Sequence, residues 1–151
     1  MKIGENAPDF TLKDGDGRDW KLAEHLAKTV VLMFYPGDNT PVCTKQMCSV
    51  RDNWAQFRGT GAEIVGISTD SAASHKNFAA KNNFPFTLLS DEAGEVITKY
   101  GVKSWIPGRA ARAIVVIDRK GKIAYHKAQS ISLFRPDDAE TLAAIRRARG
   151  V

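Results

Sequence analysis

Residues 29–48 read TVVLMFYPGDNTPVCTKQMC and contain the pattern that decides the fold. Residues 29–34 form a short apolar run rich in β-branched side chains, which is typical of a buried strand. After a turn-forming segment, Thr40 and Pro41 predict a helix start, because threonine is a good N-cap and proline suits the first helical position. A strand that leads directly into a helix indicates an α/β protein.

Two further apolar runs have the same character. Residues 62–68 and 113–118 are short, rich in β-branched side chains and bounded by polar residues, so both are predicted to be buried strands. The segments 40–57 and 71–82 are polar and compatible with helices. The order strand, helix, strand, helix predicts a layered α/β fold with parallel strands.

Hairpins are expected on both sides of this core. Residues 10–12 and 19–22 flank the sequence DGDG at 14–17, which has the composition of a tight turn. The third apolar run continues through a turn at Gly121 into residues 122–125, which predicts a second hairpin. Antiparallel hairpins beside parallel strands make the predicted sheet mixed.

The C-terminal segment is predicted to form a helix. It begins at Pro136, carries Leu142 and Ile145 at helical spacing, and ends in arginines that complement the carboxyl end of a helix dipole. Apart from the arginines within residues 146–149, the basic residues are spread along the chain, although the net charge is +5. We therefore expect no nucleic-acid partner.

Length and composition favour a single folded domain over residues 1–151. The chain is 43% hydrophobic and 26% charged, and it is long enough to bury a core without disulfide or metal staples. No apolar run approaches the roughly 18–20 residues of a membrane span, and the first residues do not resemble an export signal. We expect a soluble cytoplasmic protein that does not bind a membrane.

The cysteines Cys43 and Cys48 lie in the helix predicted after Thr40. If Pro41 is the first helical residue, Cys43 is the third, where unpaired N–H groups and the helix dipole favour a thiolate and lower the thiol pKa. Cys43 could instead be a small buried apolar residue. A lone cysteine pair in a reducing compartment is more often catalytic or metal-binding than structural, so Cys43 is predicted to be a nucleophile.

Helix geometry restricts what Cys48 can do. Positions 43 and 48 of an ideal helix place their Cα atoms about 8.6 Å apart and about 140° around the axis. A disulfide tolerates at most about 7 Å between Cα atoms. Either the two cysteines never pair, or pairing unwinds the start of the helix. So short a loop would stabilise the chain by only about 2 kcal/mol, so redox chemistry is a better reason for the pair than stability.

The pattern Pro36-x-x-x-Thr40-x-x-Cys43, directly after an apolar strand, resembles the active-site signature of the peroxiredoxins, which are thiol peroxidases with a thioredoxin fold. With Cys48 and the Arg51-Asp52 pair, the segment is similar to the bacterioferritin-comigratory or Q-type subfamily. The similarity extends from residues 4–10 to the predicted second hairpin. It implies a thioredoxin-like fold, with a central mixed sheet flanked by helices and an N-terminal hairpin.

The resemblance also implies roles for five residues. Cys43 would be the peroxidatic cysteine, which attacks a peroxide oxygen and becomes a sulfenic acid. Thr40 would hydrogen-bond the thiolate and the peroxide, and Pro36 would shield the thiolate from water. Arg112 would stabilise the thiolate and polarise the O–O bond. Cys48 would be the resolving cysteine, which forms an intramolecular disulfide.

Two alternatives to this role of Arg112 are open. Arg109 lies three residues from Arg112 and is an alternative to it, and Arg112 itself could be a solvated charge at the start of a strand.

The implied partners are a hydroperoxide substrate and thioredoxin or a similar dithiol reductant, with no cofactor or metal and a monomer or weak homodimer. One alternative is a thioredoxin-like disulfide oxidoreductase, which normally carries a Cys-x-x-Cys motif that this chain lacks. Another is a copper-binding module, but His25, His75 and His126 lie at no ligand-like spacing from the cysteines.

Overall fold

The structure, a computed structural model of the chain, describes residues 2–38, 41–104, 108–129 and 138–148. The strands are β1 (Thr11–Asp14), β2 (Asp19–Lys21), β3 (Val30–Phe34), β4 (Glu63–Ser68), β5 (Thr87–Ser90), β6 (Arg112–Ile117) and β7 (Ile123–Gln129). The helices are α1 (Pro41–Asp52), α2 (Trp54–Gly59), α3 (Ala72–Asn82), α4 (Glu95–Lys99) and α5 (Asp138–Ala148), with a short 3-10 helix η1 (Leu22–His25).

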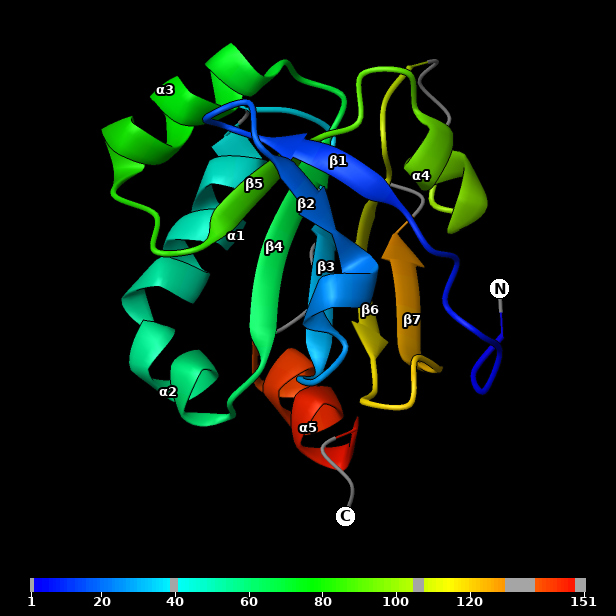
Figure 1. The fold of residues 1–151 in the computed structure, drawn as a ribbon. Coiled ribbons are helices and arrows are strands. Elements are labelled where there is room, and N and C mark those ends of the chain that lie inside the picture. The colour runs from blue at the N-terminus through cyan, green and yellow to red at the C-terminus, as the bar shows by residue number, and fades with distance from the viewer. Residues whose placement is uncertain (1, 39–40, 105–107, 130–137, 149–151) are drawn as a thin grey trace.

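Across the described residues the strands form one seven-stranded sheet in the order β2-β1-β5-β4-β3-β6-β7 (Figure 1). Strand β3 is parallel to β4, and β4 is parallel to β5. Strand β6 runs antiparallel to β3, and β7 runs antiparallel to β6. The predicted mixed sheet is confirmed, and the three predicted apolar strands correspond to β3, β4 and β6 within about one residue at each end.

Both predicted hairpins are present, and their turns use the same chemistry. In the first, Asp14 Oδ1 accepts the N–H groups of Asp16 and Arg18 at 2.9 and 3.0 Å. In the second, Asp118 Oδ1 accepts two backbone N–H groups at 2.9 and 3.0 Å, and Gly121 adopts a left-handed φ of 78°. An aspartate that organises its own turn explains why both hairpins are predictable from sequence.

Two elements lack a strong sequence signal. Strand β5 is a four-residue segment that becomes a strand because it pairs with β4 on one side and β1 on the other. Helix α4 has five residues and follows Gly94, whose φ is 72°. Neither segment is long enough to show a clear hydrophobic period.

The core has two parts, as expected when residues alternate between the faces of central strands. Every residue of β3 and β6 is buried. One part of the core joins the sheet to α1, α2, α3 and α5 through Met47, Val50, Phe57, Phe78, Leu142 and Ile145. The other joins it to β2, η1 and α4 through Trp20, Leu22, Val96 and Ile97. No helix in the described part of the chain has the length and apolar character needed to cross a membrane.

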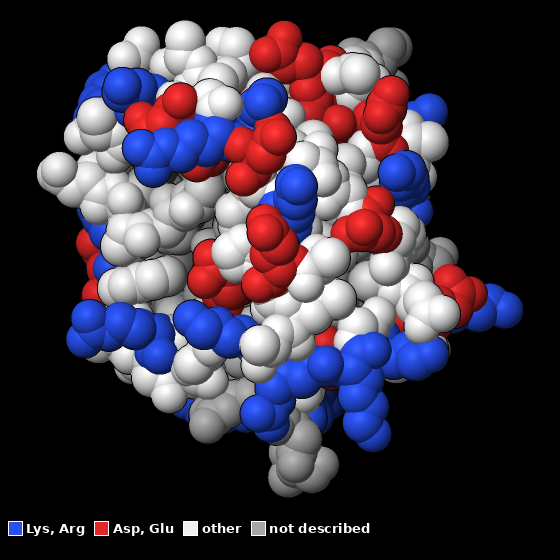
Figure 2. All heavy atoms as spheres, viewed as in Figure 1, with Lys and Arg blue, Asp and Glu red and all other residues white. Residues whose placement is uncertain are grey.

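Basic side chains lie closer together on the surface than their spread along the sequence suggests. Lys and Arg side chains concentrate on the lower part of the face shown in Figure 2. A shallow hollow of about 810 Å³ is lined by Arg119, Lys120 and Lys122 of the β6–β7 turn and by Arg147 of α5. The β6–β7 turn and Arg147 are separated along the chain and are brought together by the fold.

Candidate active site

The topology brings the predicted site to one edge of the sheet, the upper edge in Figure 1. Because β3, β4 and β5 are parallel, the loops that follow them lie at the same edge. Strand β6 is antiparallel to β3, so its first residue, Arg112, lies at that edge as well. Helix α1 starts there, after the loop that leaves β3.

Helix α1 begins at Pro41, as predicted. Cys43 is therefore the third helical residue and lies in the first turn, where the backbone N–H groups have no partner within the helix. The side chain of Cys43 and all of Thr40 lie outside the described part of the chain, so the predicted N-cap at Thr40 falls there too.

Gly66 allows α1 to pack closely on the sheet. A Cβ atom at Gly66 would lie 2.7 Å from Leu88 Cδ2, 3.2 Å from Tyr35 Cε1 and 3.3 Å from Met47 Cε. Met47 belongs to α1, and Tyr35 is the first residue after β3. The missing side chain at Gly66 thus makes room for the Tyr35 ring and for the helix that carries both cysteines.

Asp38 is held from several directions in the loop between β3 and α1. Its carboxylate accepts hydrogen bonds from the Tyr35 hydroxyl (Oδ1, 2.7 Å) and the Ser74 hydroxyl (Oδ2, 2.7 Å). His75 Nδ1 lies 2.9 Å from Oδ2. The backbone N–H of Asp38 donates to Asp70 Oδ2 at 2.7 Å. Both the side chain and the backbone of Asp38 are thus fixed to residues that follow β4.

His75 completes this network inside the protein. Its side chain is 0% exposed, and that of Asp38 is 1% exposed. On its other side, Nε2 lies 2.9 Å from the carbonyl oxygen of Leu89 in β5. Both ring nitrogens therefore face oxygen acceptors, and both hydrogen bonds form only when both nitrogens carry a proton. His75 and Asp38 therefore form a buried pair that is linked directly to β5.

The network changes the acidity of two of its members. Burial alone would raise the pKa of Asp38, but the hydrogen bonds from His75, Tyr35 and Ser74 outweigh it and hold that pKa below its ordinary value. Burial, with the Asp38 charge beside it, raises the pKa of Tyr35 well above its ordinary value. Asp38 is therefore ionised and Tyr35 neutral at physiological pH.

The two arginines near the site differ in burial and contacts. Arg112 is 1% exposed, so it is not a solvated charge at a strand end. It is adjacent in β6 to Ala113, which pairs with Phe34, the last residue of β3. Arg109 has a side chain that is 45% exposed, and its Nη1 donates to the Pro36 carbonyl at 2.9 Å. Arg109 thus binds the backbone of the loop, whereas Arg112 is buried at the start of β6.

Cys48 carries a free, half-buried thiol. Its Sγ lies 4.0 Å from Asn82 Oδ1 at the end of α3. Arg51 donates from Nη1 to the Asn82 carbonyl at 2.6 Å, so α1 is attached to α3 one turn beyond Cys48. Because α1 is continuous through both cysteines, a disulfide between them requires part of this helix to unwind.

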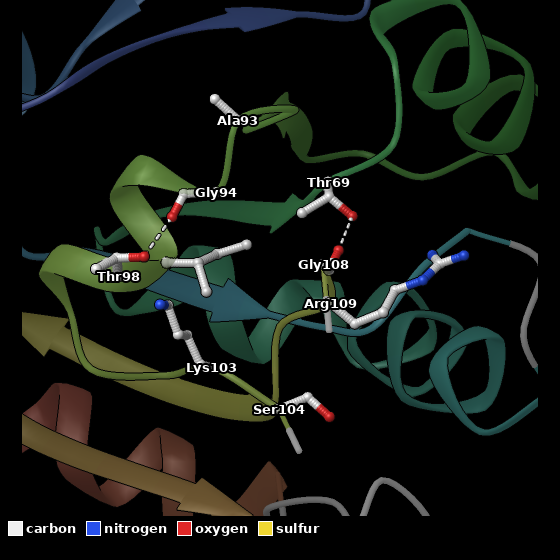
Figure 3. A pocket seen from close by; sticks show the side chains of 9 residues that line it. Thr69, Ala93, Gly94, Thr98, Lys103, Ser104, Gly108 and Arg109 are labelled. Carbon is white, nitrogen blue, oxygen red and sulfur yellow. Dashed lines mark hydrogen bonds between the residues drawn. The ribbon is translucent and has the colours of Figure 1, made fainter. Parts of the chain in front are cut away.

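A cavity of about 340 Å³ lies beside the loop that contains Pro36 (Figure 3). Thr69, Gly94, Thr98, Lys103 and Ser104 line it together with Arg109. The Thr69 hydroxyl donates to the Gly108 carbonyl at 3.0 Å, which joins the loop after β4 to the segment that leads into β6.

The described part of the chain contains no group of three His, Cys, Asp or Glu side chains placed to hold a metal. The three histidines of the copper-binding alternative have separate partners. His75 is held by Asp38, His25 stacks on Trp20 with ring centroids 4.2 Å apart, and His126 Nε2 lies 2.8 Å from the Tyr100 carbonyl.

Comparison with known proteins matches residues 3–126 to the AhpC/TSA family. The chain belongs to the AhpC/TSA family. Among curated relatives of this AhpC/TSA protein, peroxiredoxin Q, chloroplastic, from Triticum aestivum is 50% identical over 123 residues, which is 81% of this chain and 57% of the relative. The relative of the same name from Sedum lineare is 49% identical over 121 residues, 80% of this chain and 65% of the relative. The chain spans less than two thirds of the length of these relatives.

Solved structures agree with this assignment. The crystal structure of peroxidoxin BcpB from Mycobacterium tuberculosis superposes with a TM-score of 0.89 and 36% identity, over 99% of both chains. The predicted resemblance to the peroxiredoxins is confirmed, and so is the thioredoxin-like α/β fold.

In this AhpC/TSA protein, Pro36, Cys48 and Arg112 of the predicted site are described with their side chains, and they lie around α1 and the loop before it. Asp38 and His75 were not among the residues predicted for the peroxidase site. A signal was available: Asp38 follows β3, and His75 lies in the first turns of the helix that follows β4. Polar residues that follow neighbouring parallel strands meet at one edge of a sheet.

Proposed function

We propose that this chain is a thiol-dependent peroxidase that reduces hydrogen peroxide and organic hydroperoxides. The observation that carries the proposal is the position of Cys43 in the first turn of α1, at the sheet edge where Arg112 is buried. Arg112 places a permanent positive charge at this edge, and a nearby positive charge favours the thiolate over the thiol. Membership of the AhpC/TSA family supports the same activity.

In the first step, the Cys43 thiolate attacks one oxygen of the peroxide. A sulfur–oxygen bond forms and the O–O bond breaks. The sulfur is oxidised to a sulfenic acid, and the departing oxygen takes up a proton and leaves as water or an alcohol. The Arg112 charge stabilises the thiolate before attack and the negative charge on the departing oxygen during it. Thr40 hydrogen-bonds the thiolate and the peroxide, and Pro36 shields both from water.

In the second step, the Cys48 thiol attacks the sulfenic sulfur of Cys43. A disulfide forms, the S–O bond breaks, and water leaves with the thiol proton. Thioredoxin or a similar dithiol then reduces the disulfide and is itself oxidised. The free, half-buried Cys48 thiol on the same helix supports this role.

The proposal also covers the domain organisation, location, oligomeric state and partners of the protein. We infer a single catalytic domain over residues 1–151, acting in the cytoplasm as a monomer or weak homodimer, without cofactor, metal, membrane or nucleic-acid partner. The hydroperoxide and the dithiol reductant are then the only molecules that the catalytic cycle needs.

Hydrogen peroxide consumption by wild type, Cys43→Ser and Cys48→Ser tests the proposal. With thioredoxin as reductant, we expect both variants to be inactive. With dithiothreitol, Cys48→Ser should regain turnover, because a small thiol can reduce the sulfenic acid directly, whereas Cys43→Ser should stay inactive. Activity in Cys43→Ser would refute the proposal. Insulin reduction by the wild type without peroxide would instead indicate the disulfide oxidoreductase.

Arg112→Ala tests the role of the buried cation. We expect the rate constant for peroxide to fall by about 100-fold or more, the size typical of losing one group that stabilises transition-state charge. The pKa of Cys43, followed by thiolate absorbance, should rise. Arg119→Ala, in the exposed β6–β7 turn, is the matched control. Unchanged peroxide rate and thiol pKa in Arg112→Ala would show that the cation is assigned wrongly.

A further inference from the structure

The buried pair of Asp38 and His75 needs an explanation that stability does not supply. The two side chains are 1% and 0% exposed, and their closest atoms lie 2.9 Å apart. Removing two charges from water costs about as much as their attraction returns, so well-packed apolar residues often stabilise a core equally well. What a buried ion pair can provide, and apolar packing cannot, is one defined arrangement of the groups that it joins.

The groups joined here are the loop before α1 and three rigid elements. His75 lies in α3 and reaches the Leu89 carbonyl of β5 with its second nitrogen. Asp70 follows β4; it accepts the Asp38 N–H at 2.7 Å and is itself fixed by the Ser68 hydroxyl at 2.8 Å. Asp38 is therefore fixed relative to α3, β4 and β5 at once.

The opposite side of the loop is fixed by Arg109, which donates to the Pro36 carbonyl. Its Nη1 lies 3.9 Å from Asp70 Oδ1. Arg109, Asp70, Asp38 and His75 are thus linked in one series, in which the two acidic residues are joined through the Asp38 backbone N–H. Arg109 binds the loop at Pro36, and Asp70 binds it at the Asp38 N–H. His75 binds the Asp38 side chain. Cys43 follows Asp38 by five positions, so the place where α1 begins depends on this loop.

We propose that Asp38 and His75 are positioning residues for Cys43. Their ion pair fixes the loop from which α1 starts, and so fixes the Cys43 sulfur relative to Arg112 and the bound peroxide. This inference rests on the proposed peroxidase function. In this role His75 acts through Asp38, and Asp38 acts through the loop.

The test uses His75→Asn, Asp38→Asn and the double variant, each in a Cys48→Ser background so that Cys43 is the one remaining thiol. Two rates are measured: oxidation of Cys43 by hydrogen peroxide, and alkylation by iodoacetamide at a pH where Cys43 is fully ionised. Peroxide reduction needs exact placement of the sulfur, whereas alkylation of a thiolate does not. We expect the peroxide rate to fall about tenfold or more in each single variant, and the alkylation rate to stay unchanged.

The double variant separates action through Asp38 from two independent effects. If His75 acts through Asp38, the double variant should react with peroxide no more slowly than the slower single variant. Losses that multiply would overturn the proposal. So would a peroxide rate equal to that of the parent in a folded His75→Asn protein.

His126→Asn is the matched control, because His126 also bonds to a backbone carbonyl through its ring but lies in β7, away from the loop. It should keep the parent peroxide rate. If His75→Asn does not fold, Ser74→Ala removes one hydrogen bond to Asp38 and leaves the ion pair. A smaller loss of peroxide rate is then expected, and no loss would overturn the proposal. A parent that fails to react with peroxide would refute the proposed function itself, and the positioning role with it.

Discussion

Asp38 shows how one residue can join a loop to the rest of the protein. It has no neighbour in sequence that reveals its importance, since His75 and Ser74 are more than 30 positions away. Roles for Pro36, Cys43 and Cys48 are predicted from the sequence because these residues form a local motif with a fixed spacing. The Asp38 network could not be predicted, because its members meet only when parallel strands bring their following loops together.

The lowered pKa of Asp38 predicts a pH dependence of stability. The folded state holds the carboxylate ionised to a lower pH than the unfolded state, whose pKa is near the ordinary 3.8. The stabilisation is therefore complete above that value and is lost as the pH falls below it, through the folded pKa. The groups facing the carboxylate are Tyr35, Ser74 and His75, with Asp70 at its backbone.

Urea unfolding of wild type and Asp38→Asn over a pH series measures this effect. We expect the difference in unfolding free energy between the two proteins to be constant near neutral pH and to shrink below about pH 4. Asp16→Asn is the control, because the Asp16 side chain is 60% exposed. A difference that stays constant down to the acid transition would show that Asp38 is not stabilised in its charged form.

At the scale of elements, α1 has to satisfy two demands. As a continuous helix it places Cys43 in its first turn, but as a continuous helix it also keeps Cys43 and Cys48 too far apart to pair. This conflict could be predicted from sequence, because the proline start and the five-residue spacing are both local. Strand β5 and helix α4 could not, because their formation depends on partners elsewhere in the sheet and core.

Oxidation is therefore expected to unwind part of α1. Treatment with one equivalent of hydrogen peroxide should reduce the far-UV helical signal by about one to two turns of helix. It should also change the fluorescence of Trp54, which begins α2, is separated by one residue from the end of α1, and packs on Phe86. Dithiothreitol should restore both signals. Cys48→Ser, which cannot form the disulfide, should keep its helical signal. An unchanged spectrum in a protein that mass spectrometry shows to be disulfide-bonded would contradict the prediction.

At the scale of the whole molecule, the two-layer core depends on close contact between α1 and the sheet. The three apolar strands could be predicted from the sequence, and they are found as β3, β4 and β6. The close approach of α1 to the sheet at Gly66 could not be predicted, because a glycine within an apolar run does not reveal which side chains will pack against it. Tyr35 follows β3, Leu88 lies in β5 and Met47 lies in α1, and all three approach Gly66.

Gly66→Ala tests this contact. The added methyl group would meet Leu88 at 2.7 Å and the Tyr35 ring at 3.2 Å, so we expect a loss of about 1–3 kcal/mol in unfolding free energy. Gly59→Ala is the matched control. Gly59 closes α2 and has no atom within 4 Å of an added Cβ, so this variant should be neutral or slightly stabilising. Equal stability of the two variants in urea would show that the layers can separate at Gly66 without cost.

Helix α3 holds both ends of the segment that must rearrange. Its first turns bind Asp38 through Ser74 and His75, and its last residue, Asn82, binds Arg51. The segment that rearranges is thus attached to α3 at both of its ends. A short segment that is held at both ends has few conformations to search. Helix α1 should therefore re-form rapidly once the disulfide is reduced, without refolding of the surrounding layers.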